Sequence, residues 1–216
     1  MLEAGARALQ TGAPTSRLDL HLTGIHPLKG MAGHQMVAHH YCEQVNEDFA
    51  QCALFDDDGE QARLNGIEYI ISARVFESLP AEERAYWHPH NYEILSGQLV
   101  APGLPDAAET AFMRGKMNSY GKTWQLWDTG APGRAAAALP AGDPLLAWSL
   151  NRDGEADPAL LDDYQRRQRI DPEKKRAERG ELKTLARPQE GVDALKGRFG
   201  RDTRDLPGVQ ERKAQP

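Results

Sequence analysis

Cysteine is scarce in this chain, and neither a secretory signal nor a membrane span is visible. Only Cys42 and Cys52 occur, and the first residues hold no apolar run of the length that a signal peptide needs. No window approaches the ~18 consecutive apolar residues of a transmembrane helix. These absences exclude a disulfide-rich secreted scaffold and a membrane-spanning protein. They predict a soluble, cytoplasmic protein with reduced thiols.

Basic residues are too few for a nucleic-acid-binding protein. Lysine and arginine number 26 against 32 aspartate and glutamate residues, which gives a formal net charge of −6. Binding to nucleic acid needs a basic surface, so nucleic acid is excluded as a partner. The sequence also has no glycine-rich phosphate loop, no nucleotide-binding fingerprint and no Gly-x-Ser-x-Gly elbow. The signatures of nucleotide-dependent enzymes and of serine hydrolases are therefore absent.

The composition of the whole chain is typical of a globular protein, with 40% hydrophobic and 27% charged residues. We predict a flexible N-terminus over residues 1–17 and one domain over residues 18–150. Residues 151–216 are dense in charge and thin in apolar residues, which predicts a partly helical or disordered tail that adds little to the core.

Residue patterns predict a mixture of short strands and short helices. Alternation of polar and apolar residues predicts strands over 18–22, 35–43, 49–55, 62–72, 92–100 and 120–128. Capping and proline signals predict helices that begin at Pro80, Asp106, Pro158 and Pro172. A turn at residues 46–48 joins the second strand to the third. This order predicts an α+β fold, with a few short helices packed on an antiparallel sheet and a polar helical tail.

Histidines gather in one part of the sequence, since all seven lie between residues 21 and 90. His88 and His90 are two residues apart, so in an extended segment their imidazoles point to the same side. Neutral imidazole is the commonest protein ligand for zinc, iron, copper or nickel. We therefore predict a site for a divalent transition metal around this pair.

Further donors are needed to complete such a site. The candidates are His40, His39, His26 and Glu93, with Glu68 as another carboxylate that could complete it. Two histidines and a carboxylate suit iron(II), and three histidines suit zinc with a bound water. The site is either catalytic or purely a binding site. The alternative is that the histidines are structural and bonded to the main chain.

The two cysteines lie symmetrically about Glu47, so a hairpin that turns there would place them on opposite strands. Two reduced, buried thiols are our first interpretation of this pair. A disulfide and a thiolate-rich metal site are the alternatives.

Several motifs resemble those of the oil body-associated protein family, which carries the DUF1264 domain. They extend over about residues 20–150 and include His39-His40-Tyr41-Cys42, Asn46-Glu47-Asp48-Phe49, Gly66-Ile67-Glu68-Tyr69, Trp87-His88-Pro89-His90 and Tyr120-Gly121-Lys122-Thr123-Trp124. Plant members are named for their association with lipid storage bodies, and no catalytic mechanism accompanies the family name. The resemblance implies an alternative function, a non-enzymatic protein that binds a lipid surface, a small-molecule ligand or a protein partner. The stretch His88–Glu93 also resembles the first metal motif of the cupins, but no second cupin motif follows it.

Overall fold

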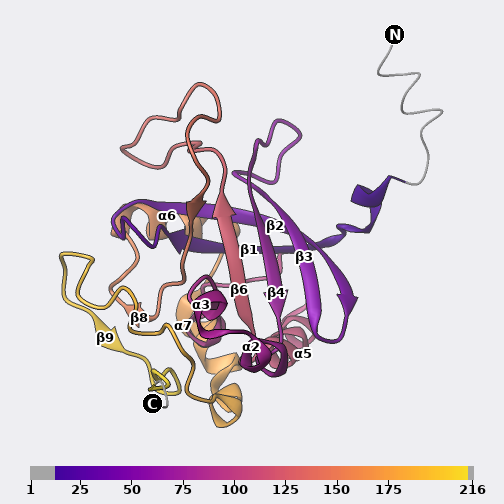
Figure 1. The fold of residues 1–216 in the computed structure, drawn as a ribbon, viewed down its shortest axis with the longest axis vertical. Helices are drawn as coiled ribbons and strands as arrows, with labels where there is room; N and C mark the ends of the chain where they lie inside the picture. Colours follow the sequence, from indigo (N-terminus) through magenta and orange to yellow (C-terminus); the bar gives the residue numbers. More distant parts are fainter. Residues whose placement is uncertain (1–12, 214–216) are drawn as a thin grey trace.

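A curled antiparallel sheet forms the centre of the computed structural model, which describes residues 13–213 (Figure 1). Its strands are β1 (Leu20–Pro27), β2 (Gln35–Asn46), β3 (Phe49–Phe55), β4 (Leu64–Ile71), β5 (His88–Pro89), β6 (Tyr120–Gln125) and β7 (Leu145–Leu146). The order is β1-β2-β3-β4-β6-β5, and β7 also pairs with β6. A second sheet joins β8 (Arg152–Asp153) to β9 (Arg204–Asp205). The predicted α+β fold around an antiparallel sheet is confirmed.

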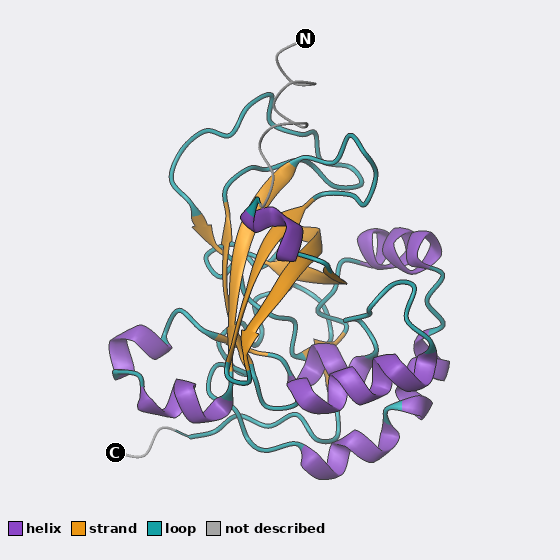
Figure 2. Cartoon of the chain, turned by 90° about the vertical axis from the view of Figure 1, so that its right-hand side faces the viewer, coloured by secondary structure: helices purple, strands orange, loops and turns teal. Residues whose placement is uncertain are grey.

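The helices are short, and most lie on one side of the sheet (Figure 2). They are α2 (Ala73–Ser78), α3 (Ala81–Arg84), α4 (Asn91–Ser96), α5 (Asp106–Lys116), α6 (Pro158–Gln168) and α7 (Pro172–Glu178), with 3-10 helices η1 (Pro14–Arg17) and η2 (Gly180–Leu185). The predicted caps of α6 and α7 are confirmed, because Asp157 and Asp171 accept hydrogen bonds from the first turns of these helices. Within residues 13–213, no helix has the length and hydropathy needed to cross a bilayer.

The strand predicted over residues 92–100 is wrong, because the structure has helix α4 there. Every residue of α4 is buried, so hydrophobic alternation could not separate a strand from a helix in this segment. The helix ends at Gly97, whose φ of 78° is the left-handed conformation that glycine adopts after a helix. Gly97 therefore caps a helix instead of forming the predicted bulge in a strand.

The C-terminal segment contributes much more to the core than its composition predicts. Leu160, Tyr164, Leu182 and Leu195 are buried in the same hydrophobic cluster as residues of β1–β4. Most of the few apolar side chains of this segment pack against the domain, which the average composition of the segment does not show. The prediction that the segment adds little to the core is therefore wrong. Of the predicted flexible N-terminus, residues 1–12 lie outside the described part of the chain.

Arg179 anchors this segment from within the core. Its side chain is fully buried and donates hydrogen bonds to the main-chain oxygens of Ile94 and Leu99, each at 2.8 Å. It also forms an ion pair of 3.2 Å with the buried Glu109 of α5. Two hydrogen bonds and an ion pair offset part of the cost of burying this guanidinium, whose Nε has no hydrogen-bond partner in the described structure, and so these contacts fix the segment to the domain.

The cysteines confirm the predicted hairpin but not their predicted redox state. Cys42 of β2 lies directly opposite Cys52 of β3, and a disulfide joins them. Side chains that are directly opposite on neighbouring antiparallel strands are close enough to bond. The interpretation as reduced thiols is wrong, and the disulfide that we held as an alternative is present.

Candidate metal centre

Four histidines and two glutamates converge on the inner face of the sheet. His26 comes from β1, His40 from β2, Glu68 from β4 and His88 from β5, while His90 and Glu93 come from the start of α4 and its first turn. All six side chains are at most 5% exposed. The sheet therefore brings together donors that are up to 67 positions apart in the sequence, counted from His26 to Glu93.

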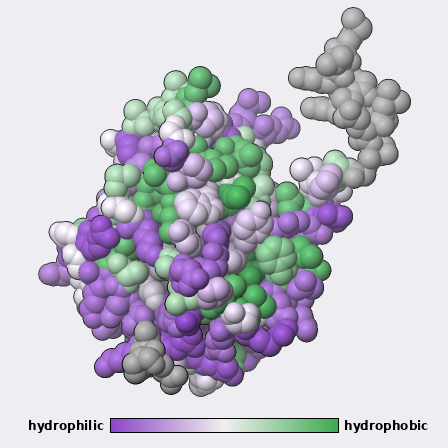
Figure 3. All heavy atoms as spheres, in the orientation of Figure 1, coloured by the Kyte–Doolittle hydropathy of each residue, from purple (hydrophilic) through white to green (hydrophobic). Residues whose placement is uncertain are grey.

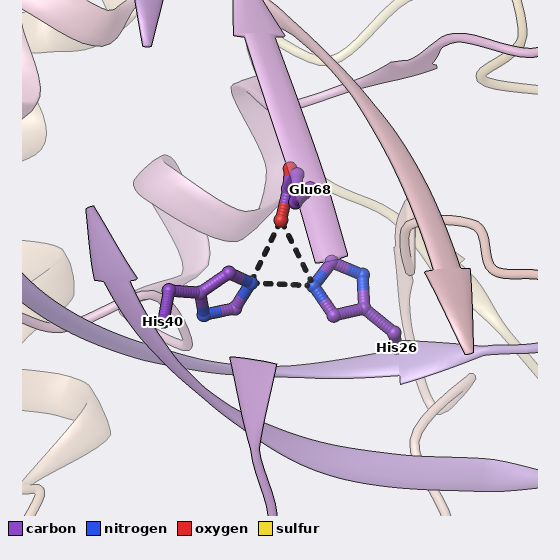
Figure 4. A group of neighbouring side chains, drawn as sticks. All are labelled: His26, His40 and Glu68. Carbon is purple, nitrogen blue, oxygen red and sulfur yellow. Dashed lines mark hydrogen bonds and ion pairs between the residues drawn. The ribbon is translucent and has the colours of Figure 1, made fainter. Parts of the chain in front are cut away.

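One oxygen of Glu68 faces His26 and His40 (Figure 4). The Oε2 atom of Glu68 lies 2.8 Å from Nε2 of His40 and 3.8 Å from Nε2 of His26. The two Nε2 atoms are 3.2 Å apart. These three donors come from three different strands and point toward a single position.

The other oxygen of Glu68 faces the predicted pair on either side of Pro89. Oε1 lies 3.3 Å from Nε2 of His90 and 3.7 Å from Nε2 of His88. The two rings are 5.0 Å apart between centroids. The extended segment His88–Pro89 thus directs both imidazoles to one carboxylate, which is the geometry that the sequence spacing predicts.

Hydrogen bonds on the far side of two rings assign their tautomers. Nδ1 of His26 lies 3.1 Å from the main-chain oxygen of Trp148, an acceptor, so this nitrogen carries the proton. Nδ1 of His90 lies 2.8 Å from Oγ of Ser119, whose own proton is donated to the main-chain oxygen of Lys116. In the neutral form of either ring, Nε2 then has a lone pair directed into the cluster.

Several polar atoms of the cluster lack an ordinary hydrogen-bond partner. Nε2 of His90 and Oε1 of Glu68 face each other at 3.3 Å, so a proton or a cation has to lie between them. Both nitrogens of His88 and Oε1 of Glu93 are buried without a hydrogen-bond partner in the described structure. Buried polar atoms without partners are costly. A cation held by Glu68, His88 and His90 would satisfy one nitrogen of His88.

Burial and mutual charge set the protonation states of the cluster. Burial lowers the pKa of His26 to about 4 and lowers the pKa of His88 well below its ordinary value, so both rings are neutral at pH 7. Burial alone would raise the pKa of Glu68, but His40 and the other imidazoles lower it well below the usual range. Burial and the charge of Glu68 raise the pKa of Glu93 well above its ordinary value. The cluster thus combines the neutral rings of His26 and His88 with the carboxylate anion of Glu68, which suits a divalent cation.

Space for the cluster depends on Gly121 of β6, which lies between β4 and β5. A Cβ at this position would lie 2.1 Å from Oε1 of Glu68, 2.6 Å from Nε2 of His90 and 2.7 Å from Cε1 of His88. A cavity of about 20 Å³ adjoins His26, His40, Glu68 and His90. This volume is close to that of a single water or ion.

His39 differs from the other predicted ligands, because it points away from the cluster. Its ring stacks on His21, and Nδ1 of His39 lies 3.1 Å from Nε2 of that residue. It borders a separate hollow of about 860 Å³ between the β3–β4 turn and α6. The physical reason is alternation along β2, which sends His39 to one face and His40 to the other.

Glu68, which the sequence analysis named only as another carboxylate that could complete the site, lies at the centre of the cluster. Glu68 and Ile70 of β4 are buried, whereas Ile67 is half-buried and Tyr69 is exposed, as alternation along a strand requires. The missing information was which face lies inward. Glu93 lies 3.8 Å from Nδ1 of His26, beyond hydrogen-bond distance, and so stands at the edge of the cluster.

Fold and site together define an α+β protein with a buried histidine–carboxylate centre. The chain belongs to the family described as "Protein of unknown function (DUF1264)", whose model matches residues 12–183. The predicted family membership is therefore confirmed. No solved structure matches the chain.

Curated relatives from plants cover most of the chain. It is 34% identical to oil body-associated protein 1A of Zea mays, over 94% of this chain and 83% of the relative. It is 31% identical to oil body-associated protein 1B of Arabidopsis thaliana, over 90% and 78%. It is 34% identical to oil body-associated protein 2A of Zea mays, over 88% and 75%. All three relatives carry the association with oil bodies in their names.

Proposed function

We propose that this protein associates with the surface of lipid bodies as a non-enzymatic binding protein. The observation that carries the proposal is the match to oil body-associated proteins along nearly the whole chain, 94% of it for the maize relative. A likeness that includes both the sheet and most of the C-terminal segment supports a shared surface as well as a shared core. The cytoplasmic location expected from the sequence then becomes a location at the boundary between cytoplasm and oil.

Flotation tests this function. The purified full-length chain is mixed with triolein droplets coated with phosphatidylcholine and centrifuged through a density gradient. We expect the protein in the floating layer with the droplets. Recovery of the protein in the soluble fraction, with droplets intact, would contradict lipid-body association.

A second function, binding of a divalent transition metal, is supported by the contact between Nε2 of His90 and Oε1 of Glu68. Two acceptors at 3.3 Å repel each other unless a proton or a cation lies between them. The ligands would be Glu68, His88 and His90, with His26 and His40 completing the set. Iron, zinc, copper and nickel all accept imidazole and carboxylate ligands. Such an ion would connect four strands of the sheet, β1, β2, β4 and β5, with the start of α4 and so stabilise the fold.

Elemental analysis of the purified protein tests metal binding. We expect about one equivalent of a transition metal, and its loss in Glu68→Gln, which keeps the shape of the side chain but removes its charge. His39→Gln is the matched control, because His39 is an equally buried histidine outside the cluster. A wild-type protein without metal, even after incubation with each of the four ions, would overturn the proposal. Equal metal content in Glu68→Gln would do so too.

A further inference from the structure

One face of the sheet carries an unbroken cross-strand row of aromatic and apolar side chains. The row begins at His21 of β1, which pairs with Tyr41 of β2, and Tyr41 pairs with Ala53 of β3. It continues through Ile67 of β4 to Trp124 of β6. Because directly paired residues of antiparallel strands lie on the same side, these five side chains lie next to one another across five strands. We call this surface the outer aromatic face.

More apolar side chains extend the outer aromatic face on both sides of the row. Leu64 is 48% exposed and pairs with Phe55, and both border an apolar groove of about 440 Å³ with Tyr41 and Ala53. On the other side, Tyr69 is 38% exposed and stacks on Phe49. Figure 3 shows hydrophobic residues gathered over the strands that face the viewer in Figure 1. An apolar surface of this extent marks a contact with another phase or molecule.

The side chains of this face have the chemistry of a membrane interface. Tyr41, Tyr69 and Trp124 each combine an apolar ring with a polar group, the type of residue that collects at the level of lipid headgroups. Tyr86, 41% exposed, lies beside Trp124 with ring centroids 6.1 Å apart. A flat face of such residues can lie on a monolayer without an amphipathic helix.

The charges around the face favour a neutral lipid surface over an anionic one. Arg17 is paired with Glu43 at 2.8 Å, Lys122 with Glu83 at 2.7 Å, and Arg63 with Asp56 at 2.8 Å. These cations are already balanced, and the whole chain has a net charge of −6. The face therefore matches a zwitterionic monolayer, and apolar contact instead of charge provides the attraction.

We propose that the outer aromatic face is the surface that contacts the phospholipid monolayer of a lipid body, an inference that rests on the lipid-body function proposed above. Leu64, Tyr69, Tyr86 and Trp124 enter the interface. Lys122 is paired with Tyr69 on the same face and keeps its ammonium group in water beside Glu83. The buried histidine cluster lies on the opposite face of the sheet and takes no part in the contact.

Paired variants test the face with the full-length chain and the phosphatidylcholine-coated triolein droplets. In Leu64→Glu/Tyr69→Glu, two exposed apolar side chains are replaced by charged ones. We expect binding to the droplets to fall roughly tenfold or more, because the apolar surface that both side chains would bury in the lipid contributes to the binding free energy. The matched control is Leu104→Glu/Leu185→Glu, with exposures of 41% and 37%; Leu104 precedes α5 and Leu185 ends η2, and this variant should bind like the wild type. Circular dichroism and melting curves check that both variants fold.

The outcomes separate this inference from the function on which it rests. If the wild type does not float, lipid-body association itself fails. If the wild type and Leu64→Glu/Tyr69→Glu float equally, association stands and the outer aromatic face is not the contact. If this variant instead changes a dimer into a monomer without loss of flotation, the face joins two copies of the chain, which also overturns the proposal. Binding should be nearly equal at low and high salt, and strong weakening by salt would contradict the neutral-surface argument.

Discussion

Gly121→Ala should abolish metal binding through a single added methyl group. Gly121 lies on β6 between the strands that carry Glu68 and His88, and the added Cβ would lie 2.1 Å from Oε1 of Glu68. An ordinary van der Waals contact begins at 3.4 Å. The carboxylate oxygen would therefore have to move by about 1.3 Å, the difference between these two distances.

That displacement is large compared with the tolerance of a metal site. Metal–ligand distances are maintained to within roughly 0.2 Å, so a shift of about 1.3 Å removes Glu68 as a ligand. His90 and His88 would also meet the methyl group, at 2.6 and 2.7 Å. Overpacking of this kind costs about 1–3 kcal/mol in the metal-free protein. The variant also loses the stabilisation of about 2.7 kcal/mol that free metal at 100 times its dissociation constant would give the wild type.

Thermal unfolding with and without added Zn²⁺ measures both effects. For a chain of this size we expect the wild type to gain roughly 5–11 °C with metal, and Gly121→Ala to gain nothing. Gly115→Ala is the matched control, since it adds the same methyl group within α5 where nothing lies within 4 Å. It should keep the full metal response and gain up to about 1 kcal/mol from better helix propensity. If Gly121→Ala responded to Zn²⁺ like the wild type, the reasoning about the site would be refuted.

Two other predictions concern the packing of the chain. Arg179→Met should lower the free energy of unfolding by about 3–5 kcal/mol, because it leaves the buried Glu109 without one of its partners. The control Arg166→Met, at an exposed arginine, should change the free energy of unfolding by less than about 0.5 kcal/mol. Equal denaturation curves for the two variants would disprove the anchoring role of Arg179. Reduction of the bond between Cys42 and Cys52 should cost about 2–3 kcal/mol, measured by urea denaturation with and without reductant, and free thiols in the unreduced protein would contradict the disulfide.

The sequence predicts the alternating strands well, because their pattern can be read locally; of β1, which is buried along most of its length, only the first residues were predicted. The strand over 49–55 has the same bounds in the structure, and the hairpin that precedes it is correct. The caps at Asp157 and Asp171 are equally local signals. Helix α4 was not predicted, because it is buried on all sides and has no polar face from which the helical period could be read.

The centre could be predicted only in part, for a different reason. The spacing of His88 and His90 shows that their rings share a side, but not which other strands come near them. That depends on the placement of β6 between β4 and β5, which is not the order along the chain. Glu68 becomes central through this crossover alone. His39 and His40 are adjacent in sequence, and choosing between them requires knowledge of which side of β2 faces the core.

The most direct test of the central claim, that these buried donors share one cation, is X-ray absorption spectroscopy of the protein loaded with one equivalent of Zn²⁺. We predict a first shell of nitrogen and oxygen donors at about 2.0–2.1 Å with multiple scattering from several imidazoles, lost in Gly121→Ala and kept in Gly115→Ala. A spectrum of hydrated zinc without imidazole scattering, or one that Gly121→Ala leaves unchanged, would contradict the claim.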